Sequence, residues 1–238
     1  YEDGKFVNAA TRGNGVVGEN ITKQALTIKN FPLAINFKGR MEIQGEGYMP
    51  LDAFDNYNAT NETPLKNARN AAAGALRNLN TTETAKRNLK VFTYNIGYIE
   101  GKTFKTHMEA LEFLQGEKFP VNPYHKLVRT IDQVIDEINF IDESRHHLNY
   151  LTDGAVIKIN DIRTREILGF TNKFPRWAIA FKFEAEEVQT KLLDVSWNVG
   201  RTGKVTPVAS LEPVEISGAM VQNATLNNVG DINRKGVR

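Results

Sequence analysis

The sequence predicts an α+β fold of largely antiparallel sheets with flanking helices, followed by the first part of a small β-barrel. Short runs of alternating polar and apolar residues, typical of half-buried strands, recur along the chain. Helical segments stand between them without the regular strand and helix alternation of a parallel sheet. From about Glu186 onward, Val, Thr and Gly become frequent and turn residues punctuate the chain, as in small barrels.

The predicted strands have two chemically different faces. They comprise Met41–Glu46, Val91–Tyr94, Ala155–Lys158 and Trp177–Phe183. Successive side chains of a strand point to opposite faces. One face of the last strand therefore carries only large apolar side chains, namely Trp177, Ile179, Phe181 and Phe183. We expect that face to belong to the core and the face with Lys182 to be open.

The predicted helices are identified by capping residues and by apolar positions at helical spacing. The clearest begins at Thr130, which is expected to form a capping box with Gln133. It carries an apolar stripe of Ile131, Val134, Ile135, Ile138 and Ile141. The Ala-rich stretch Asn67–Leu79 and the segment Thr106–Leu114 are also expected to be helical.

The change of character near residue 186 predicts two domains, residues 1–185 and 186–238. The run Val199–Gly203 is typical of a strand and turn at the opening of a barrel. Only about fifty residues follow the boundary, so we expect the barrel to be incomplete. The opening residues Tyr1–Gly4 are typical of a strand end and a turn, and we expect the start to be internal to a longer chain.

Composition limits the classes of function. Hydrophobic residues make up 41% and charged residues 24%, which excludes a mainly disordered chain. The net charge is only +2, so any phosphate-binding surface must be local. The absence of cysteine excludes disulfides, cysteine nucleophiles and thiolate zinc sites, and it fits a reducing cytoplasm. No apolar run approaches the ~20 residues of a membrane span, and the first residues do not resemble a signal peptide.

Two lysines stand on strand faces that are otherwise small. Gly154, Val156 and Lys158 share one face of their strand, which suits a flat ligand lying against it. On the last strand, two alanines lead to Lys182 and leave space for a phosphate. The alternative in each case is a lysine on a solvated sheet face.

Several other polar residues are candidates for ligand binding. Arg12 enters the Asn14-Gly15 turn, while Arg69 and Arg77 stand on the Ala-rich helix, and arginine forks suit phosphates. The alternatives are an exposed arginine in a plain hairpin and solvated arginines on a tightly packed helix. Glu46 follows a strand and is placed to accept hydrogen bonds from ribose hydroxyls, or else is a surface carboxylate.

Aromatic and histidine side chains give weaker indications. Tyr94 alternates with Phe92, which leaves a core aromatic and a stacking platform as alternatives. The histidines lack any obvious carboxylate or ligand constellation, and we expect all of them on the surface. They are His107, His125, His146 and His147.

Taken together and in order, these motifs resemble the NAD-dependent DNA ligases of bacteria. The matching segments are Ala10–Gly15, Gln44–Glu46, Ala68–Gly74, Asp153–Lys158 and Pro175–Phe183, and Val199–Gly203 and Asn223–Leu226 match the start of the family's oligonucleotide-binding (OB) barrel. The resemblance covers essentially the whole chain. It implies the nucleotidyltransferase fold of ligases and capping enzymes for residues 1–185, and the start of an OB-type barrel for residues 186–238.

The resemblance implies an enzyme of DNA replication and repair. Such an enzyme uses NAD as AMP donor and, with Mg²⁺, seals nicks in double-stranded DNA through enzyme-AMP and DNA-adenylate intermediates. Lys158 and Lys182 resemble the family's catalytic lysines beside adenine and the α-phosphate. The residues resembling its cofactor-binding set are Arg12, Glu46, Tyr94 and Val156, together with both lysines, and those resembling its phosphate- and DNA-binding set are Arg69, Arg77 and Arg145. No metal ligand is predicted, and a cytoplasmic monomer without a membrane partner is expected.

The family's Lys-x-Asp-Gly motif, whose lysine becomes adenylated, has no counterpart in these residues. We expect that lysine to precede Tyr1 in a longer protein, and this chain alone to be inactive. One alternative is a catalytically incomplete fragment that binds adenine nucleotides or DNA. Another is an ATP-dependent ligase or a capping-type nucleotidyltransferase, against which the Ala68–Gly74 and Pro175–Phe183 runs argue.

Overall fold

The computed structural model describes residues 1–171, 174–184, 187–216 and 219–236. Its contacts divide the chain into two compact units, Tyr1–Phe183 and Glu184–Arg238. The predicted boundary between residues 185 and 186 lies outside the described residues. The mixture of helices with small antiparallel sheets confirms the α+β class.

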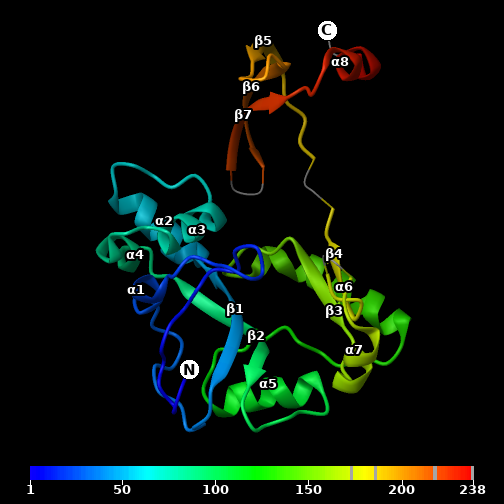
Figure 1. Cartoon of the computed structure of the whole chain (residues 1–238). Helices are drawn as coiled ribbons and strands as arrows, with labels where there is room; N and C mark the ends of the chain where they lie inside the picture. Colours follow the sequence, from blue (N-terminus) through cyan, green and yellow to red (C-terminus); the bar gives the residue numbers. More distant parts are fainter. Residues whose placement is uncertain (172–173, 185–186, 217–218, 237–238) are drawn as a thin grey trace. The chain divides into compact units, whose positions relative to one another are not determined.

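The first unit contains two separate antiparallel strand pairs, β1 with β2 and β3 with β4, and helices lie around them (Figure 1). Its elements in chain order are α1 (Thr22–Ala25), β1 (Met41–Tyr48), α2 (Leu51–Thr60), α3 (Ala68–Leu76), α4 (Thr81–Lys86), β2 (Lys90–Ile99), α5 (His107–Gly116), α6 (Ile131–Ser144), the 3₁₀ helix η1 (Arg145–His147), β3 (Gly154–Lys158), α7 (Ile162–Leu168) and β4 (Ala178–Lys182).

The second unit is an antiparallel sheet of three strands in the order β5–β6–β7. Its elements are β5 (Leu192–Val199), β6 (Val205–Ile216), β7 (Ala219–Thr225) and α8 (Val229–Lys235). Gly200 and Gly203 form the turn between β5 and β6, where Gly203 N donates to Gly200 O over 2.9 Å. Among the described residues the sheet does not close on itself, so the unit is an open sheet and not a complete barrel.

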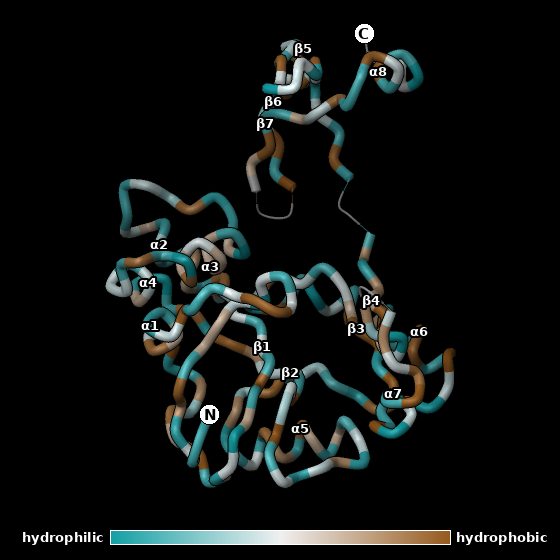
Figure 2. Tube along the Cα trace, viewed as in Figure 1, coloured by the Kyte–Doolittle hydropathy of each residue, from teal (hydrophilic) through white to brown (hydrophobic). Residues whose placement is uncertain are grey.

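Two apolar clusters form the core of the first unit. One joins the alanines of α3 to β1 and the start of α2, and its buried members are Ile28, Met49, Ala53, Ala68, Ala71, Ala72, Ala75 and Leu89. The other lies under α5 and contains Ile35, Met41, Leu111, Leu114 and Phe119. Because Leu114 is fully buried there, its truncation to alanine is expected to cost about 2–5 kcal/mol. Figure 2 shows hydrophobic and hydrophilic residues interspersed along the elements, as expected where each has one buried side.

The predicted helices are confirmed, with ends set by local capping. Asn67 accepts from Arg69 N and Asn70 N and so begins α3, which ends three residues earlier than predicted. Thr106 forms a full capping box with Glu109 at the start of α5. Thr130 caps α6 by accepting from Gln133 N, but the Gln133 side chain accepts from Arg129 N, so the second half of the predicted box is displaced by one residue.

The prediction of a core face on the last strand is wrong for its middle. Phe183 is buried, but Ile179 is 67% exposed and Phe181 is 47% exposed. The helix α6 packs against β3, and β4 is the outer strand of a sheet with only two strands. One helix on one strand leaves the neighbouring edge strand uncovered, so alternation along β4 correctly predicts its two faces but not the burial of one of them.

The prediction of surface histidines is also wrong in part. His146 and His147 in η1 are exposed, as expected. His107 and His125 are half-buried, and His125 Nδ1 lies 2.6 Å from Asn122 O. His107 stands at the start of α5 beside the buried Arg165, a contact made by tertiary packing over 58 positions of sequence.

Candidate functional site

The strand pair β3–β4 brings the two candidate lysines onto one sheet face. Gly154 pairs with Lys182, Val156 with Ala180, and Lys158 with Ala178. Directly paired residues of an antiparallel sheet point to the same side. The face therefore has a lysine at each end and small or β-branched side chains between them, and Val156 is 61% exposed on it. This is an open, flat surface between two cations.

At the first end of this face, Lys182 shares a carboxylate with Arg69. The Lys182 Nζ lies 3.2 Å from Asp153 Oδ2, and Arg69 Nη1 donates to the same oxygen over 2.9 Å. The hydrogen bond from Arg69, followed by that from Lys182, holds the pKa of Asp153 below its ordinary value. All three side chains remain exposed, so an anionic ligand has access to both cations.

Gly154, the first residue of β3, sets how closely Lys182 approaches that strand. A Cβ at Gly154 would lie 2.2 Å from the Phe181 carbonyl oxygen and 3.1 Å from the Lys182 Cα. Contacts this short require the strands to separate, so the close pairing of β3 with β4 needs a residue without a side chain. The Asp-Gly sequence thus supplies both the carboxylate that meets Lys182 and the space that lets it approach.

At the second end, Lys158 lies against Tyr94. Its Nζ is 5.0 Å from the centre of the Tyr94 ring and 3.4 Å from the Tyr94 carbonyl oxygen. Burial, with a contribution from the charge of Arg165, lowers the pKa of Lys158 to about 8. No carboxylate lies within ion-pair distance of Lys158 among the described residues. The two lysines therefore differ in burial and in partners.

The register of β1 with β2 places Glu46 beside Tyr94. Glu46 pairs with Phe92, two residues from Tyr94, and the register shift between Gln44 and Gly45 lies opposite Tyr94. The pKa of the Tyr94 phenol is raised, chiefly by burial and then by the charge of Glu46, while Arg12 acts in the opposite direction. The charge of Glu46 also contributes to the raised pKa of Arg69, after the larger effect of Asp153. These electrostatic effects indicate that Arg12, Glu46, Tyr94 and Arg69 lie close together.

Arg12 and Arg77 line a surface hollow of about 440 Å³, together with Thr11, Gly13, Val17, Gly18 and Glu19. The loop closes through Asn14, whose side-chain oxygen accepts from Val16 N and Val17 N. Gly13 has a φ of +51°, and a Cβ there would lie 1.8 Å from Val17 O. Arg77 reaches the loop from the end of α3, where its Nε lies 3.2 Å from Glu19 Oε2.

Arg145 is not joined to this group by any contact in the described part of the chain. Its Nε lies 2.8 Å from Asp142 Oδ1 as an ion pair without hydrogen-bond geometry, and its guanidinium lies 5.0 Å from the centre of the Phe183 ring. In the part of the chain that the structure describes, Val156 is likewise not joined to Tyr94 by a hydrogen bond or a strand pairing, although Lys158, two residues along the strand, lies over that ring. Six of the nine candidate residues are linked by contacts or electrostatics, Arg77 shares only the hollow with Arg12, and, among the described residues, Arg145 and Val156 are linked in neither way.

Two features of the site escape analysis of the sequence alone. Asp153 opens the Asp153–Lys158 segment but carries no predicted role, although a carboxylate directly before the glycine of a strand that contains a lysine was a usable signal. Arg165 is 6% exposed and lies behind Lys158. Nothing in the pattern of α7 distinguishes it from Arg163, which is exposed two positions earlier on the same helix.

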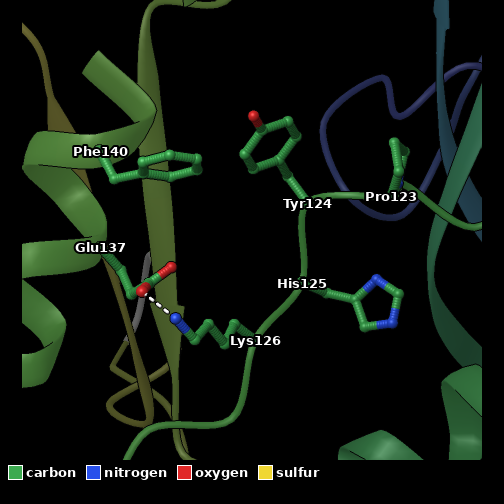
Figure 3. A pocket seen from close by; sticks show the side chains of 6 residues that line it. All are labelled: Pro123, Tyr124, His125, Lys126, Glu137 and Phe140. Carbon is green, nitrogen blue, oxygen red and sulfur yellow. Dashed lines mark hydrogen bonds and ion pairs between the residues drawn. The ribbon is translucent and has the colours of Figure 1, made fainter. Parts of the chain in front are cut away.

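A second hollow, of about 280 Å³, lies away from these residues, between α6 and the segment before it (Figure 3). It is lined by Pro123, Tyr124, His125, Lys126, Glu137 and Phe140, and an ion pair between Lys126 and Glu137 lies across it. The Tyr124 and Phe140 ring centres are 6.0 Å apart. None of the candidate residues lines this hollow, so it lies outside the candidate site.

The described residues include no group of three or more His, Asp or Glu side chains placed to hold a metal ion. Asp153, the carboxylate nearest the candidate lysines, is engaged by two cations. In the part of the chain that the structure describes, no helix has the length and apolarity needed to cross a membrane.

Comparison with known proteins identifies similar chains over the whole length. Residues 1–186 match the model of the NAD-dependent DNA ligase adenylation domain, and residues 189–238 match that of the NAD-dependent DNA ligase OB-fold domain. The chain is 59% identical over 238 residues to the DNA ligase of Alkaliphilus metalliredigens. It is 58% identical over 237 residues to that of Clostridium tetani and 53% identical over 238 residues to that of Clostridium botulinum. In each case all of this chain is matched, and it spans about 36% of the relative's length.

Proposed function

Because the chain belongs to the NAD-dependent DNA ligase family, we propose that it forms the nucleotide-binding part of an enzyme that seals nicks in double-stranded DNA with NAD as AMP donor. Residues 1–185 are assigned to the adenylation domain, with a nucleotidyltransferase fold. Residues 186–238 are assigned to the beginning of the OB-fold domain. The observation that carries the proposal is the sheet face with Lys158 at one end and Lys182 at the other, beside Tyr94 and Glu46.

The adenosine part of AMP is proposed to occupy the Lys158 end of this face. Tyr94 stacks on one side of the adenine ring and Val156 lies on the other, since an exposed aromatic ring and a small β-branched side chain suit a flat base. Glu46 and Arg12 bind the ribose, with the carboxylate accepting from its hydroxyls. The exposure of Val156 and the electrostatic coupling of Tyr94 to Glu46 and Arg12 support this assignment.

The α-phosphate is proposed to lie at the Lys182 end. There the phosphate oxygens compete with Asp153 for Lys182 and Arg69, because both cations form strong charge-assisted hydrogen bonds with phosphate oxygens. In the transfer, a lysine nitrogen bonds to the α-phosphorus as the bond to the nicotinamide mononucleotide phosphate oxygen breaks. Negative charge spreads over the phosphoryl oxygens, and positioned cations stabilise that charge.

AMP then passes to the 5′ phosphate of a nick, and the adjacent 3′ hydroxyl displaces it. Arg77 and Arg145 are assigned to phosphates of the nucleotide or the nicked DNA. The nucleophile is not one of these residues, because the 238 positions contain no Lys-x-Asp-Gly sequence. The proposed role of this chain is therefore to bind the nucleotide and to supply positive charge beside its phosphate. The whole enzyme is proposed to work as a cytoplasmic monomer.

Magnesium is proposed to act with the bound nucleotide. The described residues form no metal-binding group of their own, and Mg²⁺ is often held by one or two carboxylates together with substrate phosphates. No step of the proposal depends on a magnesium ligand from this chain.

The test is transfer of labelled AMP by the full-length protein. With NAD labelled in its adenylate half, the protein is expected to become labelled, pass the label to nicked DNA and then seal the nick, whereas ATP gives no label. Use of ATP in place of NAD would favour the ATP-dependent or capping-type alternative. Nucleotide or DNA binding without any AMP transfer would favour the incomplete binding fragment.

A further inference from the structure

Arg165 is a buried cation without a carboxylate partner. It is 6% exposed, and in the described part of the chain no Asp or Glu lies within ion-pair distance of it. Its Nη2 is buried and has no hydrogen-bond partner among the described residues. A buried cation with an unused donor costs stability, and an apolar side chain of similar length would fill the same space more cheaply. The arginine therefore needs a reason other than packing.

The contacts of Arg165 converge on the end of β3. Its Nε donates to the carbonyl oxygen of Ile159, the residue that follows Lys158. Its guanidinium lies 4.4 Å from the centre of the Trp177 ring, directly before β4. Ile159 N donates to Trp177 O over 2.9 Å, so both contacts lie on the last rung of the β3–β4 pair. The planar guanidinium of Arg165 thus connects α7 to the end of β3 and the start of β4, beside Lys158.

The same arginine faces the start of α5. Its Nη1 lies 3.4 Å from His107 Nδ1, and His107 N donates to Asn160 O over 2.8 Å. Burial, followed by the charges of Lys158 and Arg165, lowers the pKa of His107 to about 3, so this imidazole is neutral at pH 7. The groups facing Lys158 are thus Arg165 on α7, the neutral His107 on α5 and the Tyr94 ring on β2.

We propose that Arg165 is a positioning residue that holds Lys158 against the Tyr94 ring by fixing the end of β3 with its guanidinium fork. Arg165 does not touch the proposed nucleotide itself; it acts through Lys158. Its charge, unscreened by any carboxylate, also favours the neutral amine of Lys158. The consequence for nucleotide binding rests on the proposed function, whereas the effect on Lys158 does not.

The test uses the full-length protein with the variants Arg165→Gln and Arg165→Lys. Glutamine is neutral and retains a donor for Ile159 O, while lysine keeps the charge but has no fork. The matched control is Arg163→Gln, an exposed arginine on the same helix. Labelling with acetic anhydride between about pH 6 and pH 11, read by mass spectrometry of the Lys158 peptide, gives the titration midpoint of that amine. The exposed Lys23 in the same digest serves as an internal reference.

The wild-type Lys158 midpoint is expected near pH 8. Arg165→Gln is expected to raise it by about half a unit or more. Arg165→Lys keeps the low midpoint but weakens AMP binding by about tenfold, because one ammonium cannot meet both Ile159 O and the Trp177 ring. Arg163→Gln leaves both unchanged. Lower thermal stability in both Arg165 variants with an unchanged Lys158 midpoint and unchanged AMP affinity would show a purely structural arginine and overturn the proposal.

Should Arg165→Gln fail to fold, Arg165→Lys still decides: retention of full AMP affinity in that variant overturns the fork argument, and its loss supports it. If the wild-type chain binds no AMP, the proposed nucleotide site fails on its own. The Lys158 midpoint, which needs no nucleotide, then decides the positioning role: a rise in Arg165→Gln supports it and an unchanged midpoint overturns it. If Arg165→Gln has also failed to fold, the Arg165→Lys midpoint is used, and a midpoint near the ordinary value of 10.5 overturns the role of the arginine charge.

Discussion

The two ends of the β3–β4 face carry the same residue type in opposite electrostatic settings. Lys182 is exposed and shares Asp153 with Arg69, whereas Lys158 is half-buried and has Arg165, His107 and Tyr94 as neighbours. An exposed ion pair contributes little to stability, so Lys182 exchanges its partner easily. A half-buried lysine beside another cation is protonated only in part near pH 8. These two settings are the basis for proposing that Lys182 binds a phosphate and Lys158 binds the edge of a base.

The largest effect is expected at the ion-paired end. Lys182→Ala in the full-length protein is expected to slow adenylation by about 10²–10³-fold, because charge beside the phosphorus acts mainly in the transition state. Thermal stability is expected to stay close to that of the wild type, since the side chain is exposed. Single-turnover labelling with NAD and a melting curve measure the two quantities.

Lys23→Ala, at an exposed lysine of α1, is the control and is expected to change neither rate nor stability. A loss of thermal stability in Lys182→Ala that matches its loss of activity would instead indicate a structural lysine and erase the distinction between the two ends.

At the other end, Tyr94→Ala removes the ring on which Lys158 lies and the proposed adenine stacks. Stacking of a base on an aromatic ring is worth ~1–3 kcal/mol, so AMP binding is expected to weaken by roughly 5- to 150-fold. Tyr94→Phe keeps the ring and is expected to bind nearly as well. Calorimetric titration with AMP measures both variants, and identical curves for Tyr94→Ala and the wild type would remove Tyr94 from the site.

The geometry of the ion-paired end is tested by Gly154→Ala. The added Cβ meets the Phe181 carbonyl, so the strands must separate, at a cost of about 1–3 kcal/mol in unfolding free energy. Gly116→Ala, where a Cβ meets nothing within 4 Å, is the matched control and is expected to be neutral or slightly stabilising. Urea denaturation compares the two. Equal stability in both variants would contradict the close approach at Gly154.

The smallest effect concerns His107 at the Lys158 end. Its pKa is lowered to about 3 from an ordinary 6.5, so the unfolded chain binds a proton that the folded chain does not between these values. Stability is therefore complete above about pH 6.5 and falls as the pH falls toward 3. After allowance for solvent screening, the loss attributable to His107 between pH 7 and pH 5 is about 1 kcal/mol.

His107→Gln is expected to flatten this pH dependence, as urea midpoints measured at several pH values will show. His146→Gln, at an exposed histidine of η1, is the control and leaves the slope unchanged. A slope that is the same in His107→Gln and in the wild type would mean that His107 is not held neutral at this end.

Local sequence patterns predicted several elements of this protein. Alternation predicted β1, β2, β3 and β4, an Ala-rich composition predicted α3, and a capping residue predicted the start of α6, because these signals depend on neighbours within a few residues. Alternation also placed Gly154, Val156 and Lys158 on one face and Lys182 on an otherwise small one, as the register of β3 with β4 confirms. The motifs and their order identified the family, which the comparisons confirm.

The burial of individual residues and the pairing of distant charges depend on the tertiary structure. Ile179 and Phe181 are exposed because β4 is the outer strand of a two-stranded sheet, and a strand pattern does not contain the number of neighbouring layers. Arg69 meets Asp153 over 84 positions, and Arg165 meets His107 over 58. Such contacts depend on how distant segments pack, so the lowered pKa of Lys158 follows from the fold and not from the residues of its own strand.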